Sequence, residues 1–179
     1  MGTHSRTLQF NSYWFDGMLL EIFGILIVGG TIRGLSESER IKDLADSVER
    51  IHANTITTLA TSVSRLIEPS SVPSLETVCF GSEPVLPSDR DRWASKVRLL
   101  SVYGPTETCS IMLFVDMERN SPATLLCHPV GSRVWVVNHL KDNELAPLGG
   151  VSELFIEGPG LARHYLNDED KSAATFVSN

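Results

Sequence analysis

The sequence predicts an α/β protein built on a largely parallel sheet with helices on both faces, followed by a smaller β-rich part. Two observations indicate this fold. Up to about residue 115, short runs rich in β-branched and aromatic residues alternate with segments of helical periodicity, which is typical of parallel sheets. Beyond residue 128, strand-like runs follow one another with only turn-rich sequence between them.

Four runs in the first part are predicted to be strands, because each is rich in β-branched, aromatic or aliphatic residues. They cover residues 7–10, 55–59, 77–80 and 97–103. Four segments are predicted to be helices, because their apolar residues repeat at helical spacing. These are a buried helix over 15–28, an amphipathic helix over 37–51, and shorter helices over 61–67 and 88–94.

The most apolar stretch, GMLLEIFGILIVGG at residues 17–30, is not expected to cross a membrane. It is shorter than the roughly 20 residues that a spanning helix needs, and Glu21 interrupts it. It also lacks the basic flank and the cleavage site of a secretory signal. We therefore expect a buried helix inside a soluble domain.

The β-rich part, expected over residues 129–179, contains the strand-like runs RVWVVN, SELFIEG and ATFV. The stretch HLKDNELAPLGG between the first two is rich in turn-forming residues. These features predict part of a β-barrel-like subdomain. The acidic run NDEDKSA at 167–173 is interpreted as a solvated turn and the start of a helix.

Composition excludes several functional classes. The chain has 179 residues, 42% of them hydrophobic and 21% charged, which is typical of a globular protein. Its formal net charge of -7 argues against nucleic acid or an anionic membrane as a partner. Three scattered cysteines, Cys79, Cys109 and Cys127, are too few for a disulfide framework or a zinc site, so we expect reduced thiols in a cytoplasmic protein.

The stretch LLSVYGPTETC at residues 99–109 is the strongest local signal for a ligand site. Gly104 and Pro105 end the predicted strand just after Tyr103, and ligands of open α/β sheets bind beyond the carboxyl ends of strands. A tyrosine ring can stack on a heterocycle, the Thr106 hydroxyl can bond a phosphate, and the Glu107 carboxylate can bind Mg²⁺. The alternative is an ordinary strand-to-loop junction with a solvated Glu107.

Four stretches in this order, SYWFDGMLLEIFG, VCFGSEPV, VYGPTET and SELFIEGPGLARHYLN, resemble the adenylation domains of nonribosomal peptide synthetases, in the AMP-binding superfamily. DRWASKVRLL resembles their fungal branch. The resemblance covers essentially the whole chain and implies a flavodoxin-like subdomain over 1–128. It also implies a ligase of secondary metabolism that uses ATP and Mg²⁺ to form an aminoacyl adenylate. The amino acid is then loaded onto the phosphopantetheine thiol of a carrier domain, beside condensation domains.

The resemblance assigns roles to the nucleotide site. It implies that Tyr103 stacks against adenine, that Thr106, next to Gly104, faces the α-phosphate, and that Glu107 binds Mg²⁺. Gly81 and Ser82 match the turn that passes along the adenine ring, where a glycine permits close approach.

The resemblance also assigns Asp16 to the α-ammonium group of the substrate. A buried ammonium needs a counter-charge, because an unpaired buried ion costs several kcal/mol, roughly. The alternative is an aspartate that caps the following helix.

Eight further positions match the family's specificity pocket, and most are apolar, with two hydroxyls and no counter-charge. We therefore expect a neutral, mainly apolar amino acid as substrate, although each residue could equally belong to the core. These positions are Gly17, Leu20, Thr58, Val78, Phe80, Val102, Ser110 and Ile111.

Family members carry a phosphate-binding loop before the first motif, and a ribose-binding aspartate and a catalytic lysine after the last, none of which is found in this chain. We expect a central segment truncated at both ends and inactive alone, with no catalytic residue of its own. Departures such as Ser82 and Ser152, where the family has glycine, keep a second hypothesis open, a non-catalytic remnant or scaffold. A third is an acyl- or aryl-acid ligase of the same superfamily, which would not need Asp16.

Overall fold

The computed structural model describes residues 1–126, 128–138 and 141–177, and Cys127 lies outside them. The chain forms two compact units. The first holds Met1–Tyr103 and Leu113–His128, and the second holds Gly104–Met112 and Pro129–Asn179.

The described residues of the chain form a seven-stranded sheet of order β2-β1-β3-β4-β5-β6-β7. Its strands from β1 to β5 pair in parallel, whereas β6 runs antiparallel to β5. The order of the first five is that of flavodoxin-like folds, so the predicted, largely parallel sheet is confirmed. The strands are β1 (Arg6–Gln9), β2 (Thr31–Gly34), β3 (Thr55–Leu59), β4 (Thr77–Phe80), β5 (Arg98–Tyr103), β6 (Leu113–Asp116) and β7 (His128–Pro129).

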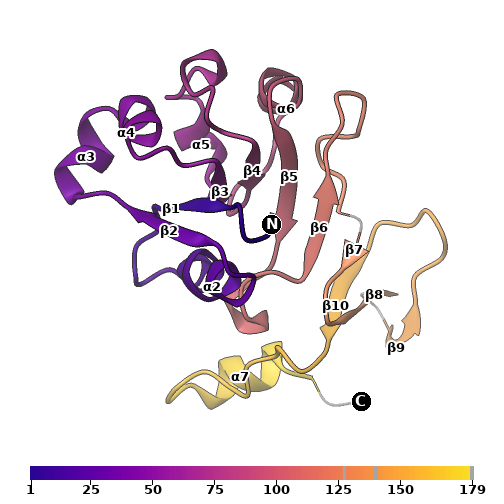
Figure 1. Cartoon of the computed structure of the whole chain (residues 1–179). Helices are drawn as coiled ribbons and strands as arrows, with labels where there is room; N and C mark the ends of the chain where they lie inside the picture. Colours follow the sequence, from indigo (N-terminus) through magenta and orange to yellow (C-terminus); the bar gives the residue numbers. More distant parts are fainter. Residues whose placement is uncertain (127, 139–140, 178–179) are drawn as a thin grey trace. The chain divides into compact units, whose positions relative to one another are not determined.

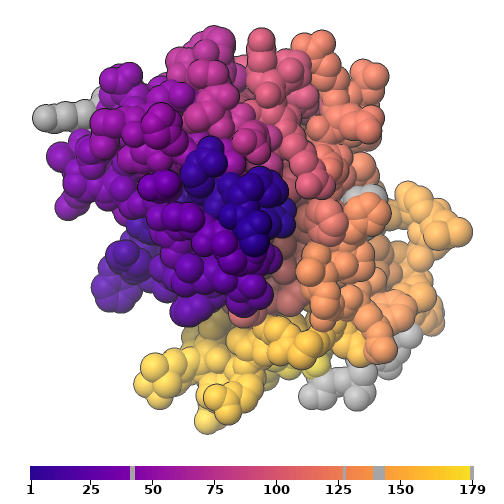
Figure 2. All heavy atoms as spheres, viewed as in Figure 1, coloured from indigo at the N-terminus to yellow at the C-terminus, as the bar shows by residue number. Residues whose placement is uncertain are grey.

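Helices flank the sheet of the first unit on both sides (Figure 1). A continuous helical segment, α1 (Gly17–Leu19), the π-helix η1 (Leu20–Gly24) and α2 (Ile25–Ile27), contacts β1 and β3 through η1 and β2 through α2. On the other side lie α3 (Glu37–Lys42), α4 (Leu44–Arg50), α5 (Thr61–Ser64), the 3-10 turn η2 (Pro69–Ser71) and α6 (Pro87–Trp93). The N-terminal residues are at the surface of this unit, where Met1 is 48% exposed (Figure 2, indigo).

Two helix predictions need correction. The segment predicted as a buried helix over 15–28 buries only one stripe, since Glu21 and Ile25 are fully buried while Phe23 and Ile27 are exposed. The predicted helix over 37–51 is two helices, because Asp43 adopts an extended backbone (φ −152°) and its side chain caps α4. Its Oδ1 accepts a hydrogen bond from the backbone N–H of Asp46 at 3.0 Å.

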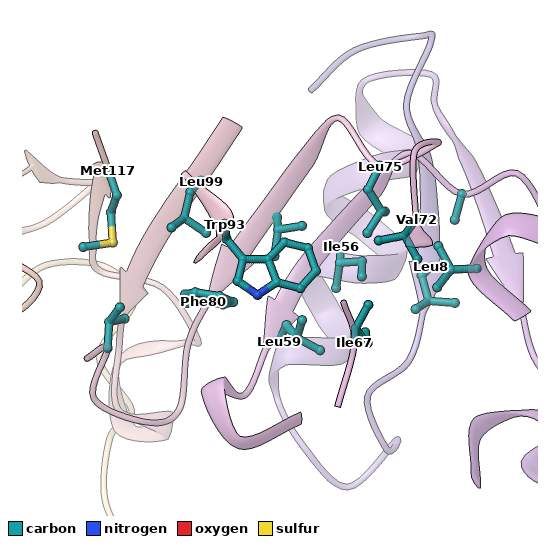
Figure 3. Packing of buried hydrophobic residues seen from close by; sticks show 14 of the residues in the cluster. Leu8, Ile56, Leu59, Ile67, Val72, Leu75, Phe80, Trp93, Leu99 and Met117 are labelled. Atoms are coloured by element: carbon teal, nitrogen blue, oxygen red, sulfur yellow. The ribbon is translucent and has the colours of Figure 1, made fainter. Parts of the chain in front are cut away.

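The hydrophobic core of the first unit lies between the sheet and helices α4 to α6 (Figure 3). Trp93 of α6 is fully buried and meets the Phe80 ring edge-on, with 6.2 Å between ring centroids. Ile56, Leu59 and Leu99 complete the centre of this cluster.

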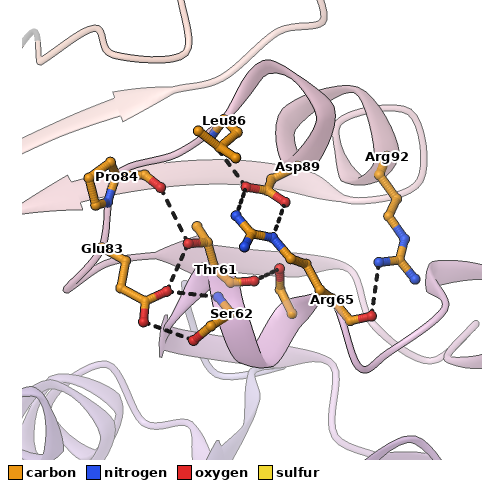
Figure 4. A network of polar contacts seen from close by, with 9 residues as sticks. Thr61, Ser62, Arg65, Glu83, Pro84, Leu86, Asp89 and Arg92 are labelled. Atoms are coloured by element: carbon orange, nitrogen blue, oxygen red, sulfur yellow. Dashed lines mark hydrogen bonds and ion pairs between the residues drawn. The ribbon is translucent and has the colours of Figure 1, made fainter.

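A polar network fixes the turn that follows β4 (Figure 4). The Glu83 carboxylate accepts hydrogen bonds from the Ser62 N–H at 2.7 Å, the Ser62 hydroxyl at 2.8 Å and the Thr61 hydroxyl at 2.9 Å, and these lower its pKa. The buried Asp89 of α6 binds the Arg65 guanidinium through two hydrogen bonds of 2.8 Å. The start of α5 is thereby tied to the turn after β4, and the end of α5 is tied to the first turn of α6.

The second unit contains a three-stranded antiparallel sheet of order β10-β8-β9 within its described residues. The runs RVWVVN and SELFIEG form β8 (Arg133–Asn138) and β10 (Glu153–Glu157). Strand β9 (Lys141–Leu145), which was not predicted, lies in the stretch that is rich in turn-forming residues. The prediction of a strand at ATFV is wrong. Helix α7 (Glu169–Thr175) takes its first two residues, and Phe176 and Val177 are in no strand. The Asp168 side chain caps this helix by accepting the N–H of Lys171, as expected for the acidic run.

Among the described residues, no helix combines the length and the apolar character that crossing a membrane requires.

Candidate functional site

Asp16 directly precedes α1 in the first unit. Its backbone is already helical (φ −64°, ψ −22°), and its side chain makes no capping hydrogen bond, so the capping interpretation does not hold. Its Oδ2 is buried and has no hydrogen-bond partner among the described residues. Because buried polar atoms are nearly always paired, this oxygen is a strong candidate for contact with a ligand.

Four of the predicted site residues meet at the carboxyl ends of β3, β4 and β5. A Cβ atom built on Gly17 would lie 3.3 Å from Thr58 Oγ1, and one built on Gly81 would lie 3.1 Å from Thr58 Cγ2 and 3.0 Å from Val102 Cγ2. A larger residue at position 17 would meet the Phe15 ring first, at 2.6 Å, and a larger residue at position 81 would press on Thr58 and Val102. The buried Thr58 hydroxyl has no partner among the described residues either.

Val78 and Phe80 belong to the hydrophobic core, the alternative that the sequence left open. Both are fully buried in the cluster that contains Trp93. Leu20, in η1, is partly buried. The contacts at this edge of the sheet join three of the predicted pocket residues, Gly17, Thr58 and Val102, with Gly81 of the predicted adenine turn.

Tyr103 is the last residue of β5, as the sequence predicts, and it is 39% exposed. Ser82 follows Gly81 in the turn after β4 and has a positive φ of 69°. This backbone region favours glycine, so Ser82 is strained.

In the second unit, the 3-10 turn η3 (Thr106–Thr108) carries two predicted nucleotide-site residues. The Thr106 side chain is exposed and Glu107 is partly buried. Ser110 (φ 75°) and Ile111 follow the turn and are partly buried. A Cβ atom at Gly104 would lie 2.0 Å from the Ser110 carbonyl oxygen, so this loop closes only with glycine at its start.

Tyr165 holds the Glu107 carboxylate. Its hydroxyl donates a hydrogen bond to Glu107 Oε1, and this bond is the largest cause of a pKa below the ordinary value for Glu107. The backbone N–H of Ala162 also donates to the Glu107 carbonyl oxygen, at 2.7 Å. The Lys171 ammonium lies 4.0 Å from the centre of the Tyr165 ring. Sequence reasoning missed Tyr165, because nothing local to its position indicates the contact.

The donor set fits Mg²⁺ only as an ion shared with a phosphate ligand. Among the described residues, no three His, Cys, Asp or Glu side chains gather to hold a metal. Mg²⁺ commonly keeps several waters and binds through one or two carboxylates plus substrate phosphates. Glu107, with a lowered pKa and Oε2 outside its bond to Tyr165, fits that requirement.

Glu21 is a second group that sequence reasoning missed. It is fully buried in η1, and its carboxylate accepts hydrogen bonds from the Phe10 N–H at 3.2 Å, the Asn11 N–H at 3.1 Å and Asn11 Nδ2 at 2.7 Å. Burial outweighs these bonds and raises its pKa to about 7. The available signal was a lone carboxylate inside the most apolar stretch of the chain.

A mainly parallel α/β sheet with polar and glycine residues at its carboxyl edge defines a class of nucleotide- and ligand-binding proteins. The chain belongs to the AMP-binding enzyme family, whose model matches residues 1–166.

Its relatives are fungal peptide synthetases. It is 65% identical over 179 residues to apicidin F synthase of Gibberella fujikuroi, covering 100% of this chain and 4% of that protein. It is 49% identical over 177 residues to HC-toxin synthetase of Cochliobolus carbonum, covering 99% of this chain and 3% of that protein. The chain thus corresponds to a small part of each relative.

A solved structure shares the fold. The structure of holo-PA1221, a nonribosomal peptide synthetase protein containing adenylation and PCP domains, matches with a TM-score of 0.83 and 22% identity. The match covers 98% of this chain and 32% of that one. The chain therefore shares the fold of part of that protein.

Proposed function

We propose that this chain carries the amino-acid site and part of the nucleotide site of an adenylation domain that activates a neutral, mainly apolar amino acid with ATP. The observation that carries the proposal is the buried, unpaired Oδ2 of Asp16. An α-ammonium group would supply both the missing hydrogen bond and the missing counter-charge. An acid that lacks an amino group would leave this oxygen unpaired, which argues against an acyl- or aryl-acid ligase.

In the proposed reaction, a carboxylate oxygen of the amino acid attacks the α-phosphorus of ATP. The new P–O bond forms while the bond to the leaving pyrophosphate breaks, which gives an aminoacyl adenylate and pyrophosphate. Asp16 holds the ammonium group, Tyr103 stacks against adenine and Thr106 donates its hydroxyl to the α-phosphate. Mg²⁺, held by Glu107, would neutralise phosphate charge when bound.

The substrate class follows from the chemistry of the pocket residues. The Phe15 ring fills the space at Gly17, where a Cβ atom would lie 2.6 Å from Phe15 Cε1, and Leu20 and Val102 are apolar. A charged side chain would lose its hydration among these residues without gaining a partner. A neutral side chain pays no such penalty.

The second proposed step passes the amino acid to a carrier domain. The phosphopantetheine thiolate would attack the carbonyl carbon of the adenylate, forming a thioester and releasing AMP. PA1221 is described as containing adenylation and PCP domains, which supports a carrier domain as partner here too. A condensation domain would use the thioester.

Amino-acid-dependent exchange of pyrophosphate into ATP tests the proposal, using the complete adenylation domain that contains this segment. Over a panel of twenty amino acids, exchange should be fastest with a neutral aliphatic or aromatic amino acid and slow with Asp, Glu, Lys and Arg. A Glu107→Ala variant serves as background. Exchange at background level with every amino acid would contradict the proposal and favour a non-catalytic scaffold.

A further inference from the structure

Glu21 occupies an unusual place for a carboxylate. It sits in the π-helical turn η1 that packs on β1 and β3, with 0% of its surface exposed. A carboxylate there costs desolvation free energy that a leucine would not. The hydrogen-bond partners of Glu21 therefore indicate what the side chain does.

Those partners all come from one short segment at the carboxyl end of β1. Glu21 Oε2 accepts from Gln9 Nε2 at 3.4 Å, from the Phe10 N–H at 3.2 Å and from the Asn11 N–H at 3.1 Å, while Oε1 accepts from Asn11 Nδ2 at 2.7 Å. These bonds close a loop between Asn11 and Glu21. Asp16 lies within this loop, so its two ends are pinned to each other.

The same network reaches the amino-acid pocket. Asn11 Nδ2 also donates to the Thr58 carbonyl oxygen, at 3.2 Å. The Thr58 side chain lies against Gly17 and Gly81. One amide group thus links the buried Glu21 carboxylate to the strand end that forms the pocket.

We propose that Glu21 is a positioning residue for the amino-acid pocket: through Asn11, it holds the loop that carries Asp16 and Gly17 in register with Thr58. The inference rests on the proposed function. It assigns Glu21 no contact with substrate or nucleotide. Small misplacements of binding groups weaken catalysis strongly. Loss of the hydrogen bonds between Glu21 and Asn11 should therefore weaken binding of the amino acid and leave ATP binding nearly unchanged.

The hydrogen-bond partners predict that glutamine is a poor replacement for the ionised form of Glu21. All four partner groups are N–H donors, and a carboxylate offers two acceptor oxygens. A glutamine would turn its own NH₂ group toward some of these donors. Gln9 is held in turn by Arg40, whose Nη2 donates to Gln9 Oε1 at 2.6 Å.

Steady-state kinetics of the complete adenylation domain test the inference. Glu21→Gln and Asn11→Ala should each raise the KM for the amino acid at least about tenfold, with the KM for ATP within about twofold of the wild-type value. Asp89→Asn is the matched control, because Asp89 is a buried, hydrogen-bonded carboxylate between α5 and α6 with no contact to Asn11 or Thr58 in the network described. It should lower the Tm and leave both KM values unchanged.

An unchanged amino-acid KM in a folded Glu21→Gln or Asn11→Ala variant would overturn the inference, as would an equal rise in the Asp89→Asn control. If Glu21→Gln fails to fold, Asn11→Ala decides, and failure of both to fold counts as evidence for a purely structural role. A wild-type domain without exchange would instead overturn the proposed function itself. The two failures are therefore distinguishable.

Discussion

At the residue scale, several residues close to the proposed site adopt conformations or positions that lower the stability of the fold. Ser82 adopts a left-handed backbone at φ 69° in the turn after β4, and Cys109 and Ser110 do so after η3. Each is a conformation that glycine adopts more easily. Glu21 adds a different cost, a carboxylate kept in the interior. Backbone strain and buried charge of this kind concentrate at functional sites.

Replacing Ser82 by glycine should stabilise the protein by about 1 kcal/mol, because it removes the penalty of a positive φ. The free energy of unfolding, measured by urea denaturation, checks this. Ser82→Ala is the control, since it removes the hydroxyl and keeps the Cβ atom. Equal stabilities for the Gly and Ala variants would show that the backbone of Ser82 is not strained.

Glu21 should make stability depend on pH between about 4.5 and 7. Its pKa rises from 4.5 to about 7 on folding, so in this window the folded chain keeps a proton that the unfolded chain has released. The free energy of unfolding should therefore fall by up to about 3 kcal/mol as pH rises through the window. In Glu21→Gln this part of the pH dependence should vanish. If the free energy of unfolding changes with pH in the same way in wild type and Glu21→Gln, Glu21 is not the cause of the pH dependence.

At the scale of elements, the sequence predicted the buried strands well and the segment ends poorly. Strands β3 and β4 have the predicted bounds. Short, continuous runs of apolar and β-branched residues favour strands that are buried on both faces of a parallel sheet. The break at Asp43 was missed because a side-chain cap leaves the hydrophobic period almost intact. Helix α7 takes the first half of a predicted strand because the cap at Asp168 starts a helix that continues to Thr175.

For the candidate site, the sequence indicated single residues but not the contacts between distant segments. Asp16, Gly17, Gly81 and Val102 could be named because they lie in the quoted motifs, whose positions are local in sequence, and Thr58 was named from the wider family resemblance. Contacts between distant segments could not be found in this way. Glu21 and Tyr165 bind partners ten and 58 residues away, and no periodicity reports such pairs.

The turn η3 and the segment that contains Tyr165 are joined by hydrogen bonds at Glu107. Tyr165→Phe removes the hydroxyl that donates to the Glu107 carboxylate, so the pKa of Glu107 should rise toward its ordinary value. Titration of the Glu107 carboxyl ¹³C shift by NMR measures this directly. Affinity for Mg²⁺ with ATP, measured by calorimetry, should fall as well.

Phe176→Leu is a suitable control for Tyr165→Phe. It removes the Phe176 ring, whose centroid lies 5.5 Å from that of the Tyr165 ring, and leaves the Tyr165 hydroxyl in place. The pKa of Glu107 should stay low in this variant. If Tyr165→Phe leaves the titration of Glu107 unchanged, the hydrogen bond does not hold the carboxylate in solution.

At the scale of the whole molecule, the fold and the family are established, and the chemistry is our proposal. The chain belongs to the AMP-binding enzyme family and spans a few per cent of its synthetase relatives. The residues proposed for amino-acid binding lie mainly in the first unit, and Thr106 and Glu107 lie in the second. The central claim is that Asp16 pairs with the α-ammonium of an amino acid.

The most direct test compares an amino acid with the same acid lacking its α-amino group, in wild type and Asp16→Ala. Asp16→Ala should lower kcat/KM for the amino acid by a factor that corresponds to about 2 to 4 kcal/mol, because the ammonium loses its partner. The low activity toward the des-amino acid should be unchanged or higher, because that substrate never had an ammonium to pair. An equal loss with both substrates, or no loss with either, would contradict the assignment of Asp16.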